Sequence, residues 1–199
     1  MRFIVGHVAG IQSVFVVNCD QTHDLTAVLP GGGQDLSALT ASDELQAKAQ
    51  ALQDLDASIR VADITPALPN ERPTTIIFLG PNYVENTKEG GYDIPDGPAL
   101  FVRNANSVLA AGAPLVRPGR SGKLGYEAEL MVIIVKGGRH ISEADALDHV
   151  FGHTVFNDGR VRDYQCETHQ WTPGKNFDNT GAIGPFVVTP TRCQRVPRV

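Results

Sequence analysis

The sequence predicts an α+β protein rich in β-structure, in which a small N-terminal α+β domain (residues 1–70) precedes a β-rich domain (residues 71–199). Short segments with many β-branched and aromatic residues recur from residue 75 onward, and such segments are typical of strands. The clearest helical spacing lies before them. Residues 61–75 separate the two parts and contain three prolines, which indicates a linker.

The N-terminal part is expected to combine a hairpin and a helix. Residues 1–30 alternate between apolar and polar side chains around Gly6 and Gly10, which predicts a β-hairpin. Residues 41–59 are the strongest helix candidate, because Ser42 is suited to cap the helix and helical spacing follows. The apolar residues with this spacing are Leu45, Ala49, Leu52 and Leu55.

The β-rich part is expected to contain five strand segments and a second helix. The strands are expected over residues 75–79, 99–102, 127–135, 153–156 and 183–188. Within the third segment, Leu130–Val135 is apolar at every position, which predicts a strand buried on both faces. The second helix is expected over residues 142–150, with Ser142 as its cap.

The composition is that of a folded globular protein, with 42% hydrophobic and 20% charged residues. A net charge of −5 argues against a nucleic-acid partner, since phosphate recognition requires clustered lysines and arginines. The apolar runs fall well short of the ~20 residues that span a bilayer, so no membrane partner is expected. The three cysteines, Cys19, Cys166 and Cys193, have no zinc or disulfide spacing, and a reducing, cytoplasmic location is expected.

Two glutamates at the start of the third strand segment indicate a cation site. Glu127 and Glu129 are two residues apart, so on a strand they share a face. An isolated pair of glutamates with this spacing usually lies on a solvated strand face. Beside a buried strand, however, each carboxylate costs several kcal/mol to desolvate unless a cation compensates its charge. Asp158, otherwise read as a turn residue before Gly159, is the natural third ligand. Three carboxylates without His or Cys suit Mg²⁺, Mn²⁺ or Ca²⁺ better than zinc.

Three segments in fixed order resemble the catalytic domain of the fumarylacetoacetate hydrolase superfamily. They are FLGPNYVENTKEGG (78–91), YEAELMVIIVKGGRHISEADALDHVFGHTVFNDGRVRDYQ (126–165) and QWTPGKNFDNTGAIGPFVVT (170–189). The resemblance implies a mixed β-sandwich or β-roll catalytic domain, with residues 1–70 matching more loosely as a small N-terminal domain. It also implies that Glu127, Glu129 and Asp158 hold the metal, as the charge argument suggests.

The resemblance further implies roles for residues that sequence patterns alone leave unplaced. A single lysine in a sequence is usually a surface charge. By the resemblance, however, Lys175 would face the bound substrate and hold its oxyanion. Tyr83 and Gln165 would line the same pocket. Arg103 would bind a substrate carboxylate, since its planar fork donates two parallel hydrogen bonds.

By resemblance, the expected activity is metal-dependent hydrolysis of carbon–carbon bonds in small anionic oxo-acids (1,3-dioxo or 2-oxo acids) of aromatic-compound catabolism, by a homodimer. The family's lid segment reads N-Y-x-x-H-x-x-E, and here Glu89 is kept while Asn86 stands at the histidine position. An amide cannot accept a proton near neutral pH. A 2-oxo-acid tautomerase or decarboxylase is therefore the alternative, and a catalytically impaired remnant is another.

The C-terminal residues differ from those of the resembling family. Family members continue well past the GPFVVTP segment, whereas this chain ends in TRCQRVPRV, a basic stretch that is either a solvated tail or out-of-frame translation. The expectation is a C-terminally truncated member with an incomplete β-rich domain.

Overall fold

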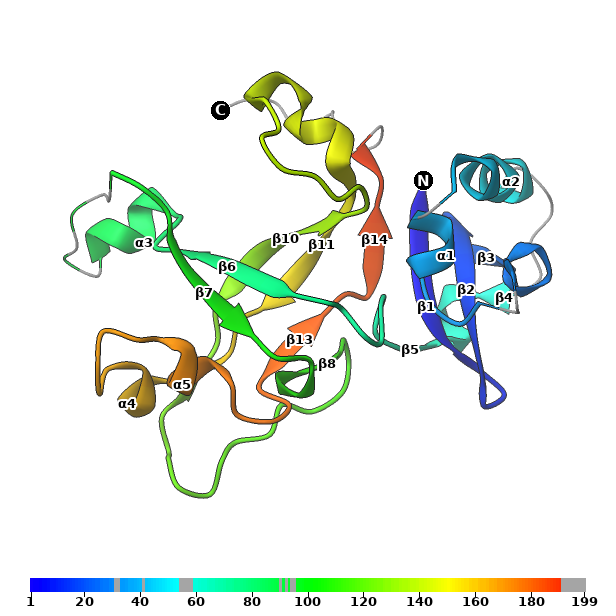
Figure 1. The fold of residues 1–199 in the computed structure, drawn as a ribbon. Helices are drawn as coiled ribbons and strands as arrows, with labels where there is room; N and C mark the ends of the chain where they lie inside the picture. Colours follow the sequence, from blue (N-terminus) through cyan, green and yellow to red (C-terminus); the bar gives the residue numbers. More distant parts are fainter. Residues whose placement is uncertain are drawn as a thin grey trace.

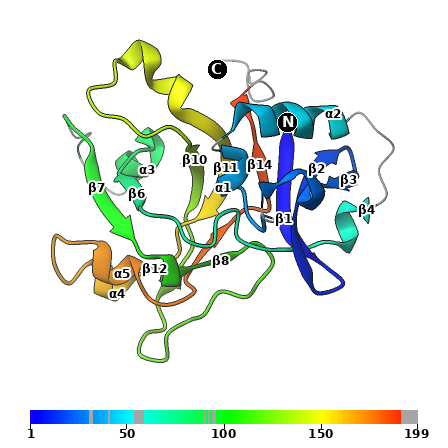
Figure 2. The ribbon, with the colours of Figure 1, turned by 45° about the vertical axis from the view of Figure 1, so that its right-hand side comes forward.

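The computed structural model describes residues 1–30, 33–40, 42–53, 59–89, 91, 93 and 96–190, without the side chains of Asn86 and Glu89. Figure 1 shows the N-terminal strands and helices on one side of the molecule and the strands that carry the site on the other. Figure 2 shows, from a second direction, that strands from both parts lie side by side in the middle.

The N-terminal part begins with an antiparallel meander of β1 (Arg2–Val8), β2 (Ile11–Asn18) and β3 (Gln21–Asp24). Ala9 and Gly10 join the first two strands with φ of 50° and 81°. Positive φ at both turn positions matches the twist of a two-residue hairpin. The predicted hairpin is therefore confirmed.

Two helices cover one face of this meander. They are α1 (Ser37–Thr40) and α2 (Asp43–Gln53). The second confirms the helix predicted over residues 41–59 as far as Gln53, whereas Ile59 lies in a strand, and residues 41 and 54–58 lie outside the described residues. Ser42 caps it, because the Leu45 N–H donates to the Ser42 Oγ at 3.3 Å. The core between helices and sheet is formed by Phe3, Val5, Val14, Val16, Leu25, Leu39, Leu45 and Ala49.

A ten-stranded mixed sheet joins the two predicted parts of the chain. Its order is β4-β3-β2-β1-β14-β11-β13-β8, with β10 on β11 and β5 on β1. The added strands are β4 (Ile59–Arg60), β5 (Thr65–Pro66), β8 (Val108–Ala110), β10 (Ala128–Ile134), β11 (Val150–Asn157), β13 (Gly181–Ile183) and β14 (Phe186–Val188). Because β1 pairs with β14, the sheet crosses the predicted boundary at residue 70, and that boundary stays a prediction.

Shorter elements surround the sheet. Two small antiparallel sheets pair β6 (Ile76–Gly80) with β7 (Ala99–Arg103) and β9 (Leu124–Gly125) with β12 (Arg160–Val161). The helices are α3 (Val84–Glu89), α4 (Arg162–Gln165) and α5 (Thr172–Lys175), and the 3-10 helices are η1 (Thr26–Val28), η3 (Val61–Asp63), η4 (Ala105–Ser107) and η5 (Glu143–His149). No helix in the described part of the chain is long and apolar enough to cross a membrane.

The five predicted strand segments all contain strands, but one of them and the second predicted helix differ in form from the prediction. Residues 183–188 belong to two strands, since Gly184 has a φ of 103° and Pro185 follows it. The second predicted helix is η5, a 3-10 helix; Ser142 caps it by accepting a hydrogen bond from the Asp145 N–H. None of its residues is buried, so little packing holds it in an α-helical geometry.

The prediction that β10 is buried on both faces is wrong. Its side chains alternate: Met131 and Ile133 pack inward, whereas Leu130 and Ile134 are 60% and 62% exposed. Apolar composition alone does not reveal which face another layer covers. Among the described residues, none covers the outer face of this strand.

A substitution at Gly6 tests the contact between β1 and β5. A Cβ on Gly6 would lie 2.4 Å from the Ile64 Cγ2 and 2.5 Å from the Thr65 carbonyl oxygen. We expect Gly6→Ala to lower the free energy of unfolding by about 1–3 kcal/mol, as overpacking usually does. Thermal and urea unfolding measure it, with Gly122→Ala as the control because no atom lies within 4 Å of a Cβ there. Equal stability of the two variants would contradict the close approach of these strands.

Candidate active site

The candidate site lies where the first residues of β10 meet the end of β11. The two strands are antiparallel, with Glu129 opposite Phe156. Just before β10, the Asp158 N–H donates to the Glu127 carbonyl oxygen at 2.9 Å. Glu127 and Glu129 are two residues apart along this strand end, so their side chains share a face. Because Asp158 is hydrogen-bonded to Glu127, the three predicted metal ligands lie in one region.

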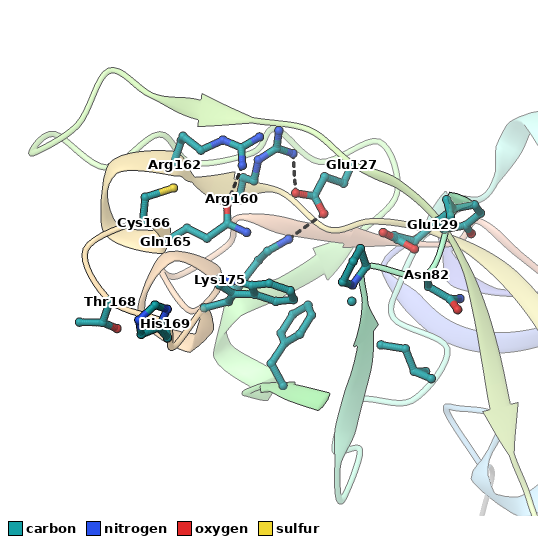
Figure 3. Close-up of a pocket in the computed structure, with 16 residues that line it drawn as sticks. Asn82, Glu127, Glu129, Arg160, Arg162, Gln165, Cys166, Thr168, His169 and Lys175 are labelled. Atoms are coloured by element: carbon teal, nitrogen blue, oxygen red, sulfur yellow. Dashed lines mark hydrogen bonds and ion pairs between the residues drawn. The ribbon is translucent and has the colours of Figure 1, made fainter. Parts of the chain in front are cut away.

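Lys175 is buried at the base of this site, with a side chain that is 1% exposed. Its Nζ donates to the Glu127 Oε2 at 2.8 Å and to the Asp158 carbonyl oxygen at 3.3 Å, and it also pairs with the Asp158 Oδ2. Figure 3 shows the ammonium group directed at Glu127. Gly174 permits this placement, because a Cβ there would lie 2.5 Å from the backbone nitrogen of Gln165.

Two arginines complete the ion pairs of these carboxylates. The Arg160 Nη1 lies 2.5 Å from the Glu127 Oε1, and the Arg103 Nη1 pairs with the Asp158 Oδ1. Asp158 is only 1% exposed, so both of its oxygens are neutralised inside the protein. The protein's own cations therefore compensate two of the three predicted metal ligands.

Glu129 differs from its two neighbours. Within the described residues it makes no ion pair and no side-chain hydrogen bond. Burial raises its pKa to about 7, the nearby charges of Asp158 and Glu127 act in the same direction, and Lys175 opposes them. Glu129 is thus the carboxylate for which the protein supplies no directly bound cation.

A cavity of about 420 Å³ opens in front of these groups. Among the predicted site residues, its walls include Tyr83, Gln165, Glu127, Glu129 and Lys175. Sequence reasoning missed several further lining residues: Phe101, Arg160, Arg162, His169 and Trp171. Arg160 and Arg162 follow Asp158 closely in the sequence, which is a local signal for this pair.

Tyr83 borders the cavity, as the resemblance implies, whereas Arg103 lies behind it. Arg103 is not among the lining residues, and its buried side chain donates to protein atoms behind Asp158. The Tyr83 hydroxyl accepts a hydrogen bond from the Leu130 N–H at 3.1 Å, although the ring borders the cavity. Asn86 and Glu89 lie in α3, and their side chains are outside the described residues.

The donor set fits a hard cation by its chemistry, although not as a preformed cage. No group of three His, Cys, Asp or Glu side chains in the described part of the chain is arranged as a metal cluster. The carboxylates nevertheless share one region, they offer only oxygen, and Glu129 has no directly bound cation. Oxygen donors of this kind suit Mg²⁺ and Mn²⁺.

The fold of this chain is shared with solved structures of enzymes. Fumarylacetoacetate hydrolase from Exiguobacterium antarcticum matches with a TM-score of 0.75 and 26% identity, covering 95% of this chain and 66% of that one. Maleylpyruvate hydrolase from Sphingobium sp. SYK-6, in complex with manganese(II) and pyruvate, matches with a TM-score of 0.77 and 24% identity, covering 100% and 69%.

Sequence comparison identifies the family. The model of the fumarylacetoacetate (FAA) hydrolase C-terminal domain matches residues 75–197, more than half of the chain. The chain therefore belongs to the fumarylacetoacetate hydrolase family, whose members are enzymes, and the predicted resemblance and fold class are confirmed. The mitochondrial oxaloacetate tautomerase fahd2 of Xenopus laevis is 36% identical over 147 residues, which cover 73% of this chain and 46% of that protein. The chain thus spans about half the length of the curated relatives it matches.

The raised pKa of Glu129 predicts a pH dependence of stability in the metal-free protein. The ordinary pKa of a glutamate is 4.5, and that of Glu129 in the folded protein is about 7. Between these two pH values the folded state therefore binds the Glu129 proton more tightly than the unfolded state does. The free energy of unfolding therefore falls as the pH rises through this window. Glu129→Gln should remove that component, which urea unfolding at about pH 5 and pH 8 with a chelator measures.

Glu143→Gln is the matched control, because Glu143 is exposed on η5. We expect the control to keep the wild-type difference in stability between the two pH values. If Glu129→Gln and wild type lose the same stability over this range, Glu129 is not the buried, poorly compensated carboxylate.

Proposed function

We propose that the protein catalyses keto–enol isomerisation of a small 2-oxo acid of the oxaloacetate type, with a bound divalent metal. The observation that carries this proposal is the Lys175 ammonium, which is buried at the base of an open cavity between two carboxylates. A fixed cation of this kind stabilises an enolate oxygen as it forms. The relationship to the Xenopus laevis oxaloacetate tautomerase supports the same reaction.

The charges of the site favour an anionic reacting species. Three carboxylates, Glu127, Glu129 and Asp158, face three cations, Arg103, Arg160 and Lys175. When all are ionised, the set is neutral, and a divalent cation raises its charge to +2. The enolate of a 2-oxo acid carries a carboxylate and an enolate oxygen, whose two negative charges would balance the loaded set, and the second carboxylate of oxaloacetate would face Arg162 at the cavity wall.

The three carboxylates would hold the metal, which acts when bound as a Lewis acid on the 2-oxo oxygen. Lys175 and Arg160 pair with the Glu127 oxygens that such an ion would use, so these two pairs would weaken when it binds. The Lys175 ammonium would lie beside the substrate oxygen. Its Nζ also lies 5.4 Å from the centre of the Phe101 ring, which helps to hold the ammonium in place.

Isomerisation fits the lid segment better than hydrolysis does. Proton transfer between carbon and oxygen of an enolisable acid needs no activated water. Asn86 replaces the histidine that the family pattern uses for that purpose, and an amide is not a base. Arg162 and His169 at the cavity wall suit the negative charge of a small acid.

The first test of this proposal is metal binding together with turnover. We expect one Mn²⁺ per chain by calorimetry, and metal-dependent ketonisation of enol-oxaloacetate followed by ultraviolet absorbance. Glu129→Ala should abolish Mn²⁺ binding, because it removes the carboxylate without a bound protein cation. Glu143→Ala is the control on an exposed helix. Equal Mn²⁺ affinity in all three proteins would remove the metal assignment.

A second candidate is hydrolysis of a carbon–carbon bond in an acylpyruvate. The match in fold to maleylpyruvate hydrolase favours it, since that protein was solved with manganese(II) and pyruvate. Hydrolysis needs a base for water, which the lid segment lacks at Asn86. The homodimer and the cytoplasmic location remain predictions, whichever of the two reactions the protein catalyses.

Restoring the histidine distinguishes the two reactions. Asn86→His should raise acylpyruvate hydrolysis by roughly 10²–10⁴-fold if a missing base limits it. Release of pyruvate, measured with a coupled dehydrogenase, reports the rate, and Asn86→Gln controls for side-chain size. No gain in a variant that still binds Mn²⁺ and substrate would leave isomerisation as the favoured reaction.

A further inference from the structure

We propose that Arg103 is a positioning residue, which orients the Asp158 carboxylate and thereby holds Lys175 in place at the base of the cavity. This inference rests on the proposed function for its catalytic consequence. Arg103 itself does not line the cavity, and its side chain has no exposed surface. It therefore has no direct route to a substrate in the cavity.

All five N–H groups of the Arg103 guanidinium have acceptors in the protein. Nε donates to the Ser107 Oγ at 3.2 Å. Nη1 donates to Asp158 and to the Gly159 carbonyl oxygen at 3.1 Å. Nη2 donates to the Ser107 carbonyl oxygen at 3.5 Å and to the Thr180 Oγ1 at 2.8 Å. A side chain with every donor occupied has one orientation.

These hydrogen bonds join three segments that are far apart in the sequence. Ser107 ends η4, Asp158 and Gly159 follow β11, and Thr180 precedes β13. The backbone reinforces the connection, since the Thr180 N–H donates to the Ser107 carbonyl oxygen at 3.0 Å. The guanidinium thus sets the distance between the turn that carries Asp158 and the strands around it.

Two glycines and an aromatic ring form the slot that holds the guanidinium. A Cβ on Gly181 would lie 2.9 Å from the Arg103 Cζ, and one on Gly159 would lie 2.0 Å from the Thr180 carbonyl oxygen. The Arg103 Cζ lies 5.5 Å from the centre of the Phe156 ring. A lysine would keep the charge in this slot, but it lacks the planar fork that reaches all these acceptors.

The link to Lys175 runs through the two oxygens of Asp158. Arg103 binds Oδ1 and Lys175 binds Oδ2. With the first oxygen held, rotation of the carboxylate is prevented, and the second oxygen keeps a fixed position for the ammonium. Loss of Arg103 would leave a buried carboxylate with Lys175 as its sole ion-pair partner among the described residues.

The test compares Arg103→Lys, Arg103→Met and Thr180→Val with wild type, and uses Arg60→Met as the control because Arg60 forms an exposed pair with Asp63. We expect Arg103→Met to weaken Mn²⁺ binding and lower kcat by about 10–100-fold, the usual effect of removing a hydrogen-bond partner of a ligand. Arg103→Lys should recover part of both losses, and Thr180→Val should give a smaller loss. KM should stay near the wild-type value.

Three outcomes of the binding and kinetic measurements would overturn the proposal. One is a rise in KM without loss of kcat, which would mean that Arg103 binds substrate directly. Another is unchanged Mn²⁺ affinity and kcat in a folded Arg103→Met protein. If Arg103→Met does not fold, unchanged Mn²⁺ affinity and kcat in both Thr180→Val and Arg103→Lys would also overturn the proposal.

Nuclear magnetic resonance of the Lys175 ammonium in metal-free protein separates this inference from the proposed function. We expect its signal to shift in Arg103→Met and in Thr180→Val but not in Arg60→Met. A wild type that binds no Mn²⁺ and isomerises no oxo-acid would defeat the proposed function, while this shift would still test the orientation of Asp158. An unchanged signal in both variants would defeat the positioning role.

Discussion

The burial of the Asp158 carboxylate is the constraint on which the site depends. A carboxylate that is 1% exposed is stable only when cations and hydrogen bonds replace its lost water. Arg103 and Lys175 meet this need from opposite oxygens, and each is itself buried. Burying Lys175 in turn requires the close approach of α5 and α4 at Gly174. Much of the geometry of the site thus follows from one buried negative charge.

Local patterns explain which parts of the site were predictable. The two-residue spacing of Glu127 and Glu129 and the turn at Asp158 are features of short segments, and sequence reasoning brought these residues together. The contact of Arg103 with Asp158 spans 55 positions and leaves no local pattern, so sequence reasoning could assign that arginine only by resemblance. The strand positions were predictable for the same reason, because alternation and β-branched residues act locally.

Burial was less predictable than secondary structure, because it depends on which other layers are present. The inner faces of β6 and β7 pack toward the site through Phe78 and Arg103, whereas their outer faces expose large aliphatic side chains. These are Ile77, Leu79, Leu100 and Val102, and the outer face of β10 and β11 similarly exposes Leu130, Val132, Ile134 and Val155. The strands that hold the pocket are thus covered on one face only by the described residues. An apolar sequence is compatible with either arrangement.

The neutral charge of the site has a consequence for how it binds its ligands. Each carboxylate now pairs with, or lies near, a protein cation, so an added divalent ion creates positive charge that the protein does not balance. Under the proposed function an anionic substrate would restore the balance, and thermodynamic linkage requires that each ligand would then raise the affinity for the other by the same factor. Arg103 does not exchange its partners in this process, since its donors are all occupied away from the cavity. Under the proposed function, the Glu127 pairs of Lys175 and Arg160 would open, whereas the Arg103–Asp158 pair would stay fixed behind them.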